Sequence, residues 1–266
     1  MVLSDIHFPY EDPQALELVK QFLQDFRPHT LVLNGDIWDM PQISKYTRRK
    51  SELKDPLNLQ EHLDYGDRGV TAIVEAARPD ETLLILGNHE DRWDSYLGSQ
   101  ARELSSLQCL DFEKLFNLDR FKWTTYGRGF WLNGSLFVYH GSFTGASNWT
   151  DRERMAAGAS TITGHMHQQK VTYFRDRSRT YKNIAQGCLC KLNAPYLKTP
   201  PNWQQGFVYG YLWDEDKFRA IETEIVQGED SIWMSPESTM YSSPRLEKGS
   251  RTLTGMAAPS DGLPEA

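Results

Sequence analysis

Five short blocks of this 266-residue chain concentrate the side chain types that bind metal ions. Five of the seven histidines of the chain lie in these blocks, so we interpret the clustering as functional. Carboxylate, amide and imidazole ligands without a neighbouring thiolate suit Mn²⁺, Fe, Zn²⁺, Co²⁺ or Ni²⁺. The candidate ligands are too numerous for one ion, whereas two divalent ions roughly 3.5–4 Å apart, bridged by a carboxylate, would use most of them. In chain order the blocks are Asp5-Ile6-His7, Gly35-Asp36-Ile37-Trp38-Asp39, Gly87-Asn88-His89-Glu90, His140-Gly141 and Gly164-His165-Met166-His167.

Each block follows a segment that the sequence predicts to be a β-strand. Apolar strand patterns cover 30–33, 82–86, 135–139 and 160–163, and a short apolar piece, Val2-Leu3, precedes the first block. Asp12-Pro13 predicts a helix start between the first two strands, and apolar residues at helical spacing continue the helix to Phe26. A strand, a helix and a strand in succession predict parallel strands. Their carboxyl ends are where α/β sheets bind ligands, so we expect the blocks to meet there.

The later part of the chain has a different pattern. A capping-box pattern, Thr150-x-x-Glu153, predicts a helix start, and strands without intervening helices are then predicted over 170–175, 180–188, 206–213 and 217–226. The predicted fold class is therefore α/β, with antiparallel strands in the second half.

We expect one domain over residues 1–227. Within it, the polar residues 40–68 are expected to form a helical insertion or lid, and a helix is predicted around Val70–Ala77. Residues 228–266, rich in Ser, Pro, Gly and Met, are expected to be a flexible tail. Because the first strand is short, the chain is expected to start downstream of its original initiation site.

The ordered blocks DxH, GDxxD, GNH(D/E), H and GHxH resemble the calcineurin-like metallophosphoesterase superfamily, and especially its compact bacterial and phage members. The set spans residues 5 to 167. The resemblance implies a four-layer αββα sandwich. It also implies that His89 is a non-ligand histidine pointing at the leaving-group oxygen, and that Asp39 orients it. The implied metal ligands are Asp5, His7 and His167 for one ion, Asn88, His140 and His165 for the other, and Asp36 as the bridge.

The implied activity is dinuclear, metal-dependent hydrolysis of phosphoesters, in which water activated by the ions attacks phosphorus. Met40 and Leu86 stand where serine/threonine phosphatases of the superfamily carry arginines, which makes that branch a poor match. Phosphodiesters are favoured as substrates. A phosphomonoesterase for small phosphates, a nuclease acting on nucleic-acid ends and a non-catalytic scaffold remain alternatives. Mn²⁺ is the ion expected to support activity most readily in vitro.

Several cationic residues are candidates for contacts with an anionic substrate. Arg92 lies just past the third block and is the first of these candidates. Two basic clusters, Lys45–Lys50 and Lys170–Lys182, either line the substrate approach or form solvated faces. Cys188 and Cys190 are interpreted as buried strand residues, because no second cysteine pair completes a zinc site.

The composition limits the remaining function classes. No apolar run approaches the roughly 18 residues of a membrane-spanning helix, and the first residues lack a signal-peptide pattern. Three cysteines indicate a reducing compartment, so we expect a cytoplasmic protein without a membrane partner, inside a host cell if a phage encodes it. The net charge of −7 argues against non-specific coating of nucleic acid but leaves room for a local basic groove. A small phosphoester or nucleotide is the expected partner, and nucleic acid is an alternative.

Overall fold

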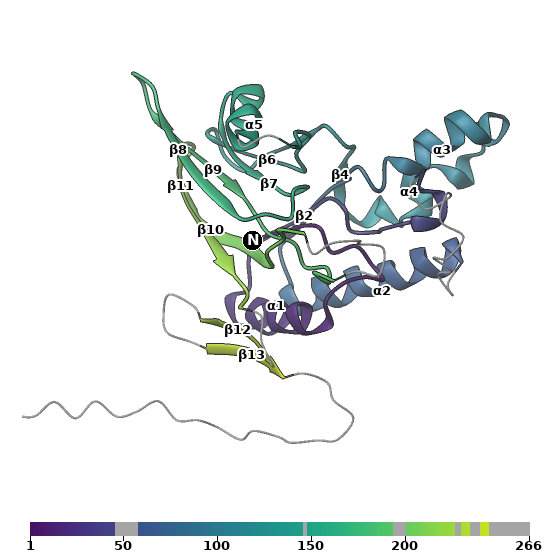
Figure 1. Cartoon of the computed structure of the whole chain (residues 1–266), viewed down its shortest axis with the longest axis horizontal. Coiled ribbons are helices and arrows are strands. Elements are labelled where there is room, and N and C mark those ends of the chain that lie inside the picture. The colour runs from purple at the N-terminus through teal and green to yellow at the C-terminus, as the bar shows by residue number, and fades with distance from the viewer. Residues whose placement is uncertain (46–57, 146–147, 194–200, 227–229, 235–239, 245–266) are drawn as a thin grey trace, which may run out of the picture.

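The computed structural model describes the chain except for residues 46–57, 146–147, 194–200, 227–229, 235–239 and 245–266. Two mixed β-sheets stack on each other, and helices cover their outer faces (Figure 1). The predicted αββα fold class is confirmed by this layering. No helix in the described part of the chain combines the length and the apolar character that a membrane crossing requires.

The first sheet has six strands, which are, in spatial order, β11 (Lys217–Glu224), β10 (Gly206–Trp213), β1 (Val2–Leu3), β2 (Thr30–Asn34), β3 (Glu81–Ile85) and β4 (Lys122–Thr124). The second sheet has five, which are β5 (Gly129–Trp131), β6 (Leu136–Tyr139), β7 (Ser160–Thr163), β9 (Thr180–Ala185) and β8 (Lys170–Arg175). The α-helices are α1 (Pro13–Phe26), α2 (Leu59–Ala77), α3 (Arg92–Gln100), α4 (Phe112–Leu115) and α5 (Trp149–Ala157). Short 3₁₀ turns are η1 (Pro41–Ile43), η3 (Arg102–Leu104), η4 (Gln108–Leu110) and η5 (Leu118–Arg120).

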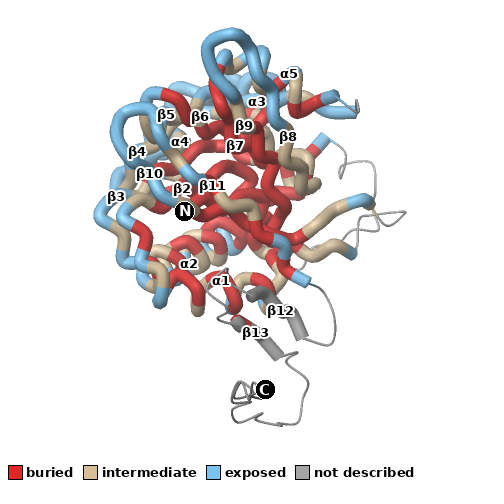
Figure 2. The backbone as a smooth tube through the Cα atoms, turned by 90° about the vertical axis from the view of Figure 1, so that its left-hand side faces the viewer, coloured by how far each residue is buried: buried red, intermediate tan, exposed pale blue. Residues whose placement is uncertain are grey.

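Two apolar cores hold the layers together, and strand alternation divides the side chains between them. On β2, Val32 packs into the core between the sheets, whereas Leu31 and Leu33 belong to the core on the opposite face of the first sheet. Helices α1 and α2 contribute to the core on the outer face of the first sheet. Helix α5 packs on β7, β8 and β9 of the second sheet. In Figure 2 the buried residues, drawn in red, accordingly lie in the interior of the molecule. Because both faces of β2 are buried, its central residues, 31–33, form a continuous apolar run rather than an alternating pattern.

The predicted β1–α1–β2 unit is confirmed. The Asp12 carboxylate accepts hydrogen bonds from the backbone N–H groups of Gln14 and Ala15, and Pro13 occupies the first helical turn. The helix ends where Arg27 adopts a left-handed conformation. β1, β2, β3 and β4 run parallel to one another, so their carboxyl ends lie at one edge of the sheet.

The strands of the second half do not form one antiparallel sheet. β8 and β9 form a hairpin in the second sheet, where β9 runs parallel to β7. β10 and β11 form another hairpin that joins the first sheet, antiparallel to β1. Local hairpin pairing was predictable from the strand pattern, but the sheet that β10 and β11 join depends on the pairing of β10 with the distant β1.

Residues 59–68 of the expected helical insertion or lid at 40–68 are helical, and they form the first half of α2, which runs on into the helix expected around 70–77. Asn58 and Glu61 make a capping box at its start, and the helix continues without a break to Ala77. Leu63 and Gly66 are buried in this half of the helix, and a Cβ on Gly66 would lie 2.2 Å from Nε1 of the Trp38 indole. Residues 46–57 lie outside the described residues, so the lid remains a prediction there.

The expectation of a flexible tail is wrong for part of 228–266. β12 (Asp230–Met234) pairs antiparallel with β13 (Met240–Pro244), and both strands pack against α1. The Tyr241 ring makes an edge contact with Phe22, and its hydroxyl donates a hydrogen bond of 3.0 Å to Asp25. One buried tyrosine offered no periodic signal in the sequence. Residues 245–266 lie outside the described residues.

We predict that Tyr241→Ala destabilises the protein by about 3 kcal/mol, because it empties a buried aromatic site against α1. Urea unfolding followed by circular dichroism measures this. Tyr173→Ala is the matched control, because Tyr173 is 67% exposed, and it should cost about 1 kcal/mol or less. Equal losses of unfolding free energy in the two variants would refute a stabilising contact between the β12–β13 hairpin and α1.

Candidate metal centre

The five sequence blocks meet at the carboxyl ends of β1, β2, β3, β6 and β7, where the two sheets face each other. The backbone there turns sharply after each strand. Five candidate ligands have positive φ angles, between 51° and 70°, which is uncommon for residues other than glycine. These residues are Asp5, His7, Asp36, His165 and His167. Such conformations persist only where surrounding contacts fix them, and they cluster at functional sites.

The first donor group consists of Asp5, His7, Asp36 and His167, whose ligand atoms all lie within 4.8 Å of one another. His167 Nε2 lies 3.0 Å from Asp5 Oδ1, and His7 Nε2 lies 3.1 Å from His167 Nε2. All four side chains are at most 5% exposed. Two imidazoles and two carboxylates that converge in a buried space form a donor set suited to a divalent cation.

The second donor group consists of Asp36, His140 and His165. His140 Nε2 lies 3.3 Å from Asp36 Oδ2 and 3.3 Å from Asn88 Oδ1, so the asparagine of the third block joins this group. Asp36 belongs to both donor groups. The structure thus brings together all seven predicted ligands in two sets that share one carboxylate, which is the arrangement required for a bridged pair of ions.

The buried carboxylates of the site favour the binding of positive charge. Burial alone disfavours a protonated His140, yet the Asp36 and Asp5 carboxylates raise the pKa of His140 to about 10. In the same way, Asp5 raises the pKa of His167 to about 9 against the effect of burial. Protons therefore balance the buried carboxylates in the metal-free chain. Metal ions would replace those protons, so metal binding should release protons.

The outward ring nitrogens of three candidate ligands have partners that fix the orientation of each ring. His140 Nδ1 lies 2.8 Å from the Asn34 carbonyl oxygen, and His7 Nδ1 lies 2.9 Å from Asp39 Oδ1. His167 Nδ1 lies 3.9 Å from Cys190 Sγ. Metal-binding histidines usually have such partners. Cys188 and Cys190 are buried, as predicted, but the contact between Cys190 and His167 was not visible in the sequence.

Glu90 joins the second and third blocks. Its buried carboxylate accepts backbone N–H groups from Gly87, Asp36, Ile37 and Trp38, at 2.7 to 3.1 Å. These four hydrogen bonds hold the loop that presents Asp36 against the loop that presents Asn88. The site therefore depends on a carboxylate that is not itself in either donor group.

Glu153 holds the loop after His140 in a similar way. It accepts backbone N–H groups from Ser142 and Phe143, at 2.7 and 2.8 Å, and the Tyr139 hydroxyl also donates to it. The predicted capping box at Thr150 and Glu153 is therefore wrong, because α5 begins at Trp149 without a side-chain cap. The pattern matched a local motif, whereas the carboxylate bonds to a loop ten and eleven residues before it in the chain.

His89, Asp39 and Arg92 form a connected group beside the donor atoms. His89 Nδ1 lies 2.9 Å from Asp39 Oδ1, and Arg92 Nη2 donates to His89 Nε2 at 2.6 Å. Because a guanidinium only donates, Nε2 must accept, which leaves the ring proton on Nδ1, directed at Asp39. Although burial opposes ionisation, His89 and His7 hold the pKa of Asp39 well below its usual range. The Arg92 Nη1 also donates to the Asp39 carbonyl at 2.7 Å.

A polar cavity of about 380 Å³ adjoins this group. It is lined by Asn88, by the charged residues Lys45, Asp91 and Arg92, and by polar side chains of α3 such as that of Ser95. Arg92, predicted as a substrate contact, thus lies between His89 and the cavity. Of the basic cluster Lys45–Lys50, the structure describes Lys45 alone, and the other residues lie outside the described residues.

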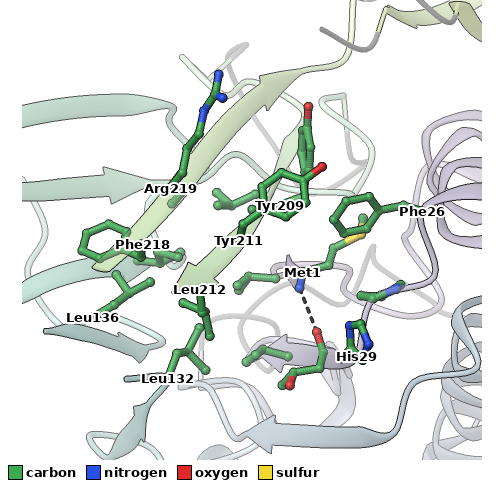
Figure 3. Close-up of a pocket in the computed structure, with 18 of the residues that line it drawn as sticks. Met1, Phe26, His29, Leu132, Leu136, Tyr209, Tyr211, Leu212, Phe218 and Arg219 are labelled. Carbon is green, nitrogen blue, oxygen red and sulfur yellow. Dashed lines mark hydrogen bonds between the residues drawn. The ribbon is translucent and has the colours of Figure 1, made fainter. Parts of the chain in front are cut away.

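A larger cavity of about 480 Å³ lies at the other end of the first sheet and contains none of the candidate ligands. Its lining is mostly apolar, and includes Phe26, Leu132 and Leu212 (Figure 3). The Met1 amino group donates to the Thr30 carbonyl oxygen at 2.8 Å there. Such a lining offers little to an anionic phosphoester.

Fold and site together define a metallophosphoesterase. The sequence matches the calcineurin-like phosphoesterase family over residues 1–202, so the chain belongs to this family. Two relatives are proteins called "Gene 54 protein". The one from Mycobacterium phage D29 is 27% identical over 221 residues, which cover 78% of this chain and 86% of the relative. The one from Mycobacterium phage L5 is 24% identical over 220 residues, with the same coverage. Among solved structures, Vps29 from Chaetomium thermophilum overlaps with 91% of this chain and 93% of its own, with a TM-score of 0.39 and 9% identity.

We predict that Glu90→Gln destabilises the protein by on the order of 3 kcal/mol. The amide group of glutamine would place an NH₂ donor where a carboxylate oxygen now accepts backbone N–H groups. Urea unfolding measures the loss, and titration with Mn²⁺ should show weaker metal binding. Glu17→Gln is the control, since the Glu17 side chain is 48% exposed and forms a surface ion pair with Lys20 on α1. A Glu90→Gln protein as stable as this control would refute the role of Glu90 in joining the two loops.

Proposed function

We propose that this protein is a dinuclear metal-dependent phosphodiesterase. The observation that carries the proposal is the position of Asp36, which both donor groups share. Two divalent ions bound there would acidify water and neutralise charge on the phosphoryl oxygens. Mn²⁺ is the ion that we expect to work most readily in vitro, because the donors are carboxylate, amide and imidazole.

His89, oriented by Asp39, would protonate the leaving group. The Asp39 carboxylate accepts a hydrogen bond from the Nδ1–H of His89, which orients the His89 ring so that Nε2 points away from Asp39. Arg92 occupies Nε2 in the structure, so an arriving substrate must displace this contact before Nε2 can hold a proton for the leaving oxygen. The displaced guanidinium then lies beside the substrate at the cavity, which reconciles its present contacts with a substrate-binding role.

Two features support diesters over monoesters. Met40 and Leu86 are buried apolar side chains, 0% and 1% exposed, at the two places where phosphatases of the superfamily carry arginines. A monoester dianion needs more positive charge than a diester monoanion, and the site offers less of it. In addition, the 380 Å³ cavity beside Asn88 gives space to the second ester group of a diester.

The alternatives differ in what the site must retain. A non-catalytic scaffold does not need a complete donor set, whereas here all seven predicted ligands converge. A phosphomonoesterase would use the same ions and is distinguished by substrate alone. The two relatives of this chain named above are encoded by mycobacteriophages. We therefore propose that the protein acts in the cytoplasm of a host cell.

Elemental analysis paired with Mn²⁺-dependent hydrolysis tests the function directly. We expect two metal ions per chain and turnover of bis-p-nitrophenyl phosphate well above that of p-nitrophenyl phosphate. Asp36→Asn should lose both ions and reduce turnover by more than about 10²-fold, because it damages both donor groups at once. Turnover of the monoester alone would refute the diesterase, and a folded protein without metal binding would favour the scaffold.

We predict that His89→Ala retains both metal ions but loses rate in proportion to the basicity of the leaving group. An alkoxide leaving group needs a proton, so hydrolysis of a dinucleoside monophosphate should fall by about 10²–10⁴-fold. p-Nitrophenolate leaves without one, so bis-p-nitrophenyl phosphate should be affected much less. Similar losses on both substrates would exclude His89 from protonating the leaving group.

A further inference from the structure

A local excess of positive charge stands out in this acidic protein. The segment from Trp149 to Lys182 contains seven Lys and Arg residues and three Asp and Glu residues, whereas the whole chain has a net charge of −7. The segment includes α5 and the β8–β9 hairpin, which pack on each other (Figure 1). It also contains the basic cluster Lys170–Lys182, which the catalytic site itself does not use.

Four of these cations lie against aromatic rings around α5. The guanidinium of Arg152 lies 4.2 Å from the ring centre of Phe143, and that of Arg154 lies 3.9 Å from the ring of Phe174. Arg179 lies 4.7 Å from Tyr181, and Lys170 lies 5.9 Å from Trp149. Phe174 and Tyr181 are opposite each other in the β8–β9 register, so they share one face of the sheet. We call these four cations and four rings the basic face.

Two of the three acidic groups of the segment bond to backbone N–H groups rather than to these cations. The Glu153 carboxylate is buried and accepts N–H groups from the loop after His140. Asp176 accepts the backbone N–H groups of Ser178 and Arg179 in the hairpin turn. In the described part of the chain, Arg152, Arg154 and Arg179 form no ion pair with a carboxylate. Arg152 and Arg179 are exposed, so their charge faces solvent.

The basic face begins at the metal centre. Phe143 is three residues beyond His140, and Lys170 is three residues beyond His167. From these two loops, the cations continue along α5 and up the hairpin to Arg179. An anionic polymer lying along this line would therefore have one end at the candidate ligands.

We propose that the basic face binds the backbone of single-stranded nucleic acid and directs it to the metal centre. This inference rests on the proposed function, since it names the polymeric diester that the same site would cleave. Phosphates would contact the guanidinium groups, whereas bases would stack on ring surface such as that of Phe174, which is 41% exposed. Stacking requires unpaired bases, so exposed ring surface beside the cations favours a single strand over a duplex.

The test is fluorescence anisotropy with a labelled oligothymidylate of about 16 nucleotides, in phosphorothioate form so that it resists hydrolysis. The full chain is loaded with Mn²⁺, and the dissociation constant is measured between about 50 and 200 mM NaCl. Each lost phosphate contact lowers the slope of log Kd against log salt by about 0.7, so Arg152→Gln/Arg179→Gln should lower it by about 1.4. Circular dichroism melts check that the variant is folded, and Arg152→Gln alone, with an expected change of about 0.7, replaces it otherwise.

Lys20→Gln/Lys122→Gln is the matched control, because it removes the same charge from α1 and β4, away from α5. Its salt slope should stay that of the unmodified chain. An equal change in the control, an unchanged slope in the arginine variant, or duplex binding as tight as single-strand binding would overturn the proposal. Binding by a chain that hydrolyses no small diester would support the basic face and refute the proposed function. Diester hydrolysis without oligonucleotide binding would do the opposite.

Discussion

The constraint on which the rest of this structure depends is a buried carboxylate that two donor groups share. Asp36 is 1% exposed, with its Oδ2 3.3 Å from His140 Nε2 and 3.8 Å from His7 Nε2. A buried carboxylate is costly unless positive charge compensates it, and here imidazoles surround it on both sides. Burial opposes its ionisation, yet His140 and His89 hold the pKa of Asp36 well below its usual range. The same compensation that protons provide in the metal-free chain is what a pair of cations would provide.

The backbone around this carboxylate has little freedom to vary. A Cβ on Gly87 would lie 2.2 Å from Asp36 Oδ1, and one on Gly35 would lie 2.4 Å from the ring of His140. Gly35 also has a φ of 81°, which other residues rarely adopt. Glu90 then fixes both loops through four backbone N–H groups. The packed sheets supply the rigidity, and the loops at their carboxyl ends supply the chemistry.

The sequence predicted the site better than it predicted the fold around it. Ligand types and block order are local properties, so the convergence of residues such as Asp5 and His167 could be expected from the family pattern. The β8–β9 and β10–β11 hairpins could be predicted as strands, but β10–β11 joins the first sheet through a pairing between segments far apart in the chain, Val2 with Val208, whereas β9 pairs with the nearby β7. The continuity of the first half of α2 with the helix around 70–77 was missed because its buried residues are sparse among charged ones. Glu153 was misassigned for the opposite reason, since a local pattern competed with a distant backbone partner.

Charge distribution connects the site to its surroundings. An overall charge of −7 repels polyanions from most of the surface, and screening limits each exposed charge to a range of about 10 Å at 0.1 M salt. The positive groups beside α5 therefore act only on a strand that is already close to them. Because this basic face starts at the loops that carry His140 and His167, the region of favourable potential adjoins the region of chemistry. An acidic protein with such a face would hold a nucleic acid at one place rather than along its whole surface, which suits cleavage at a defined position better than coating.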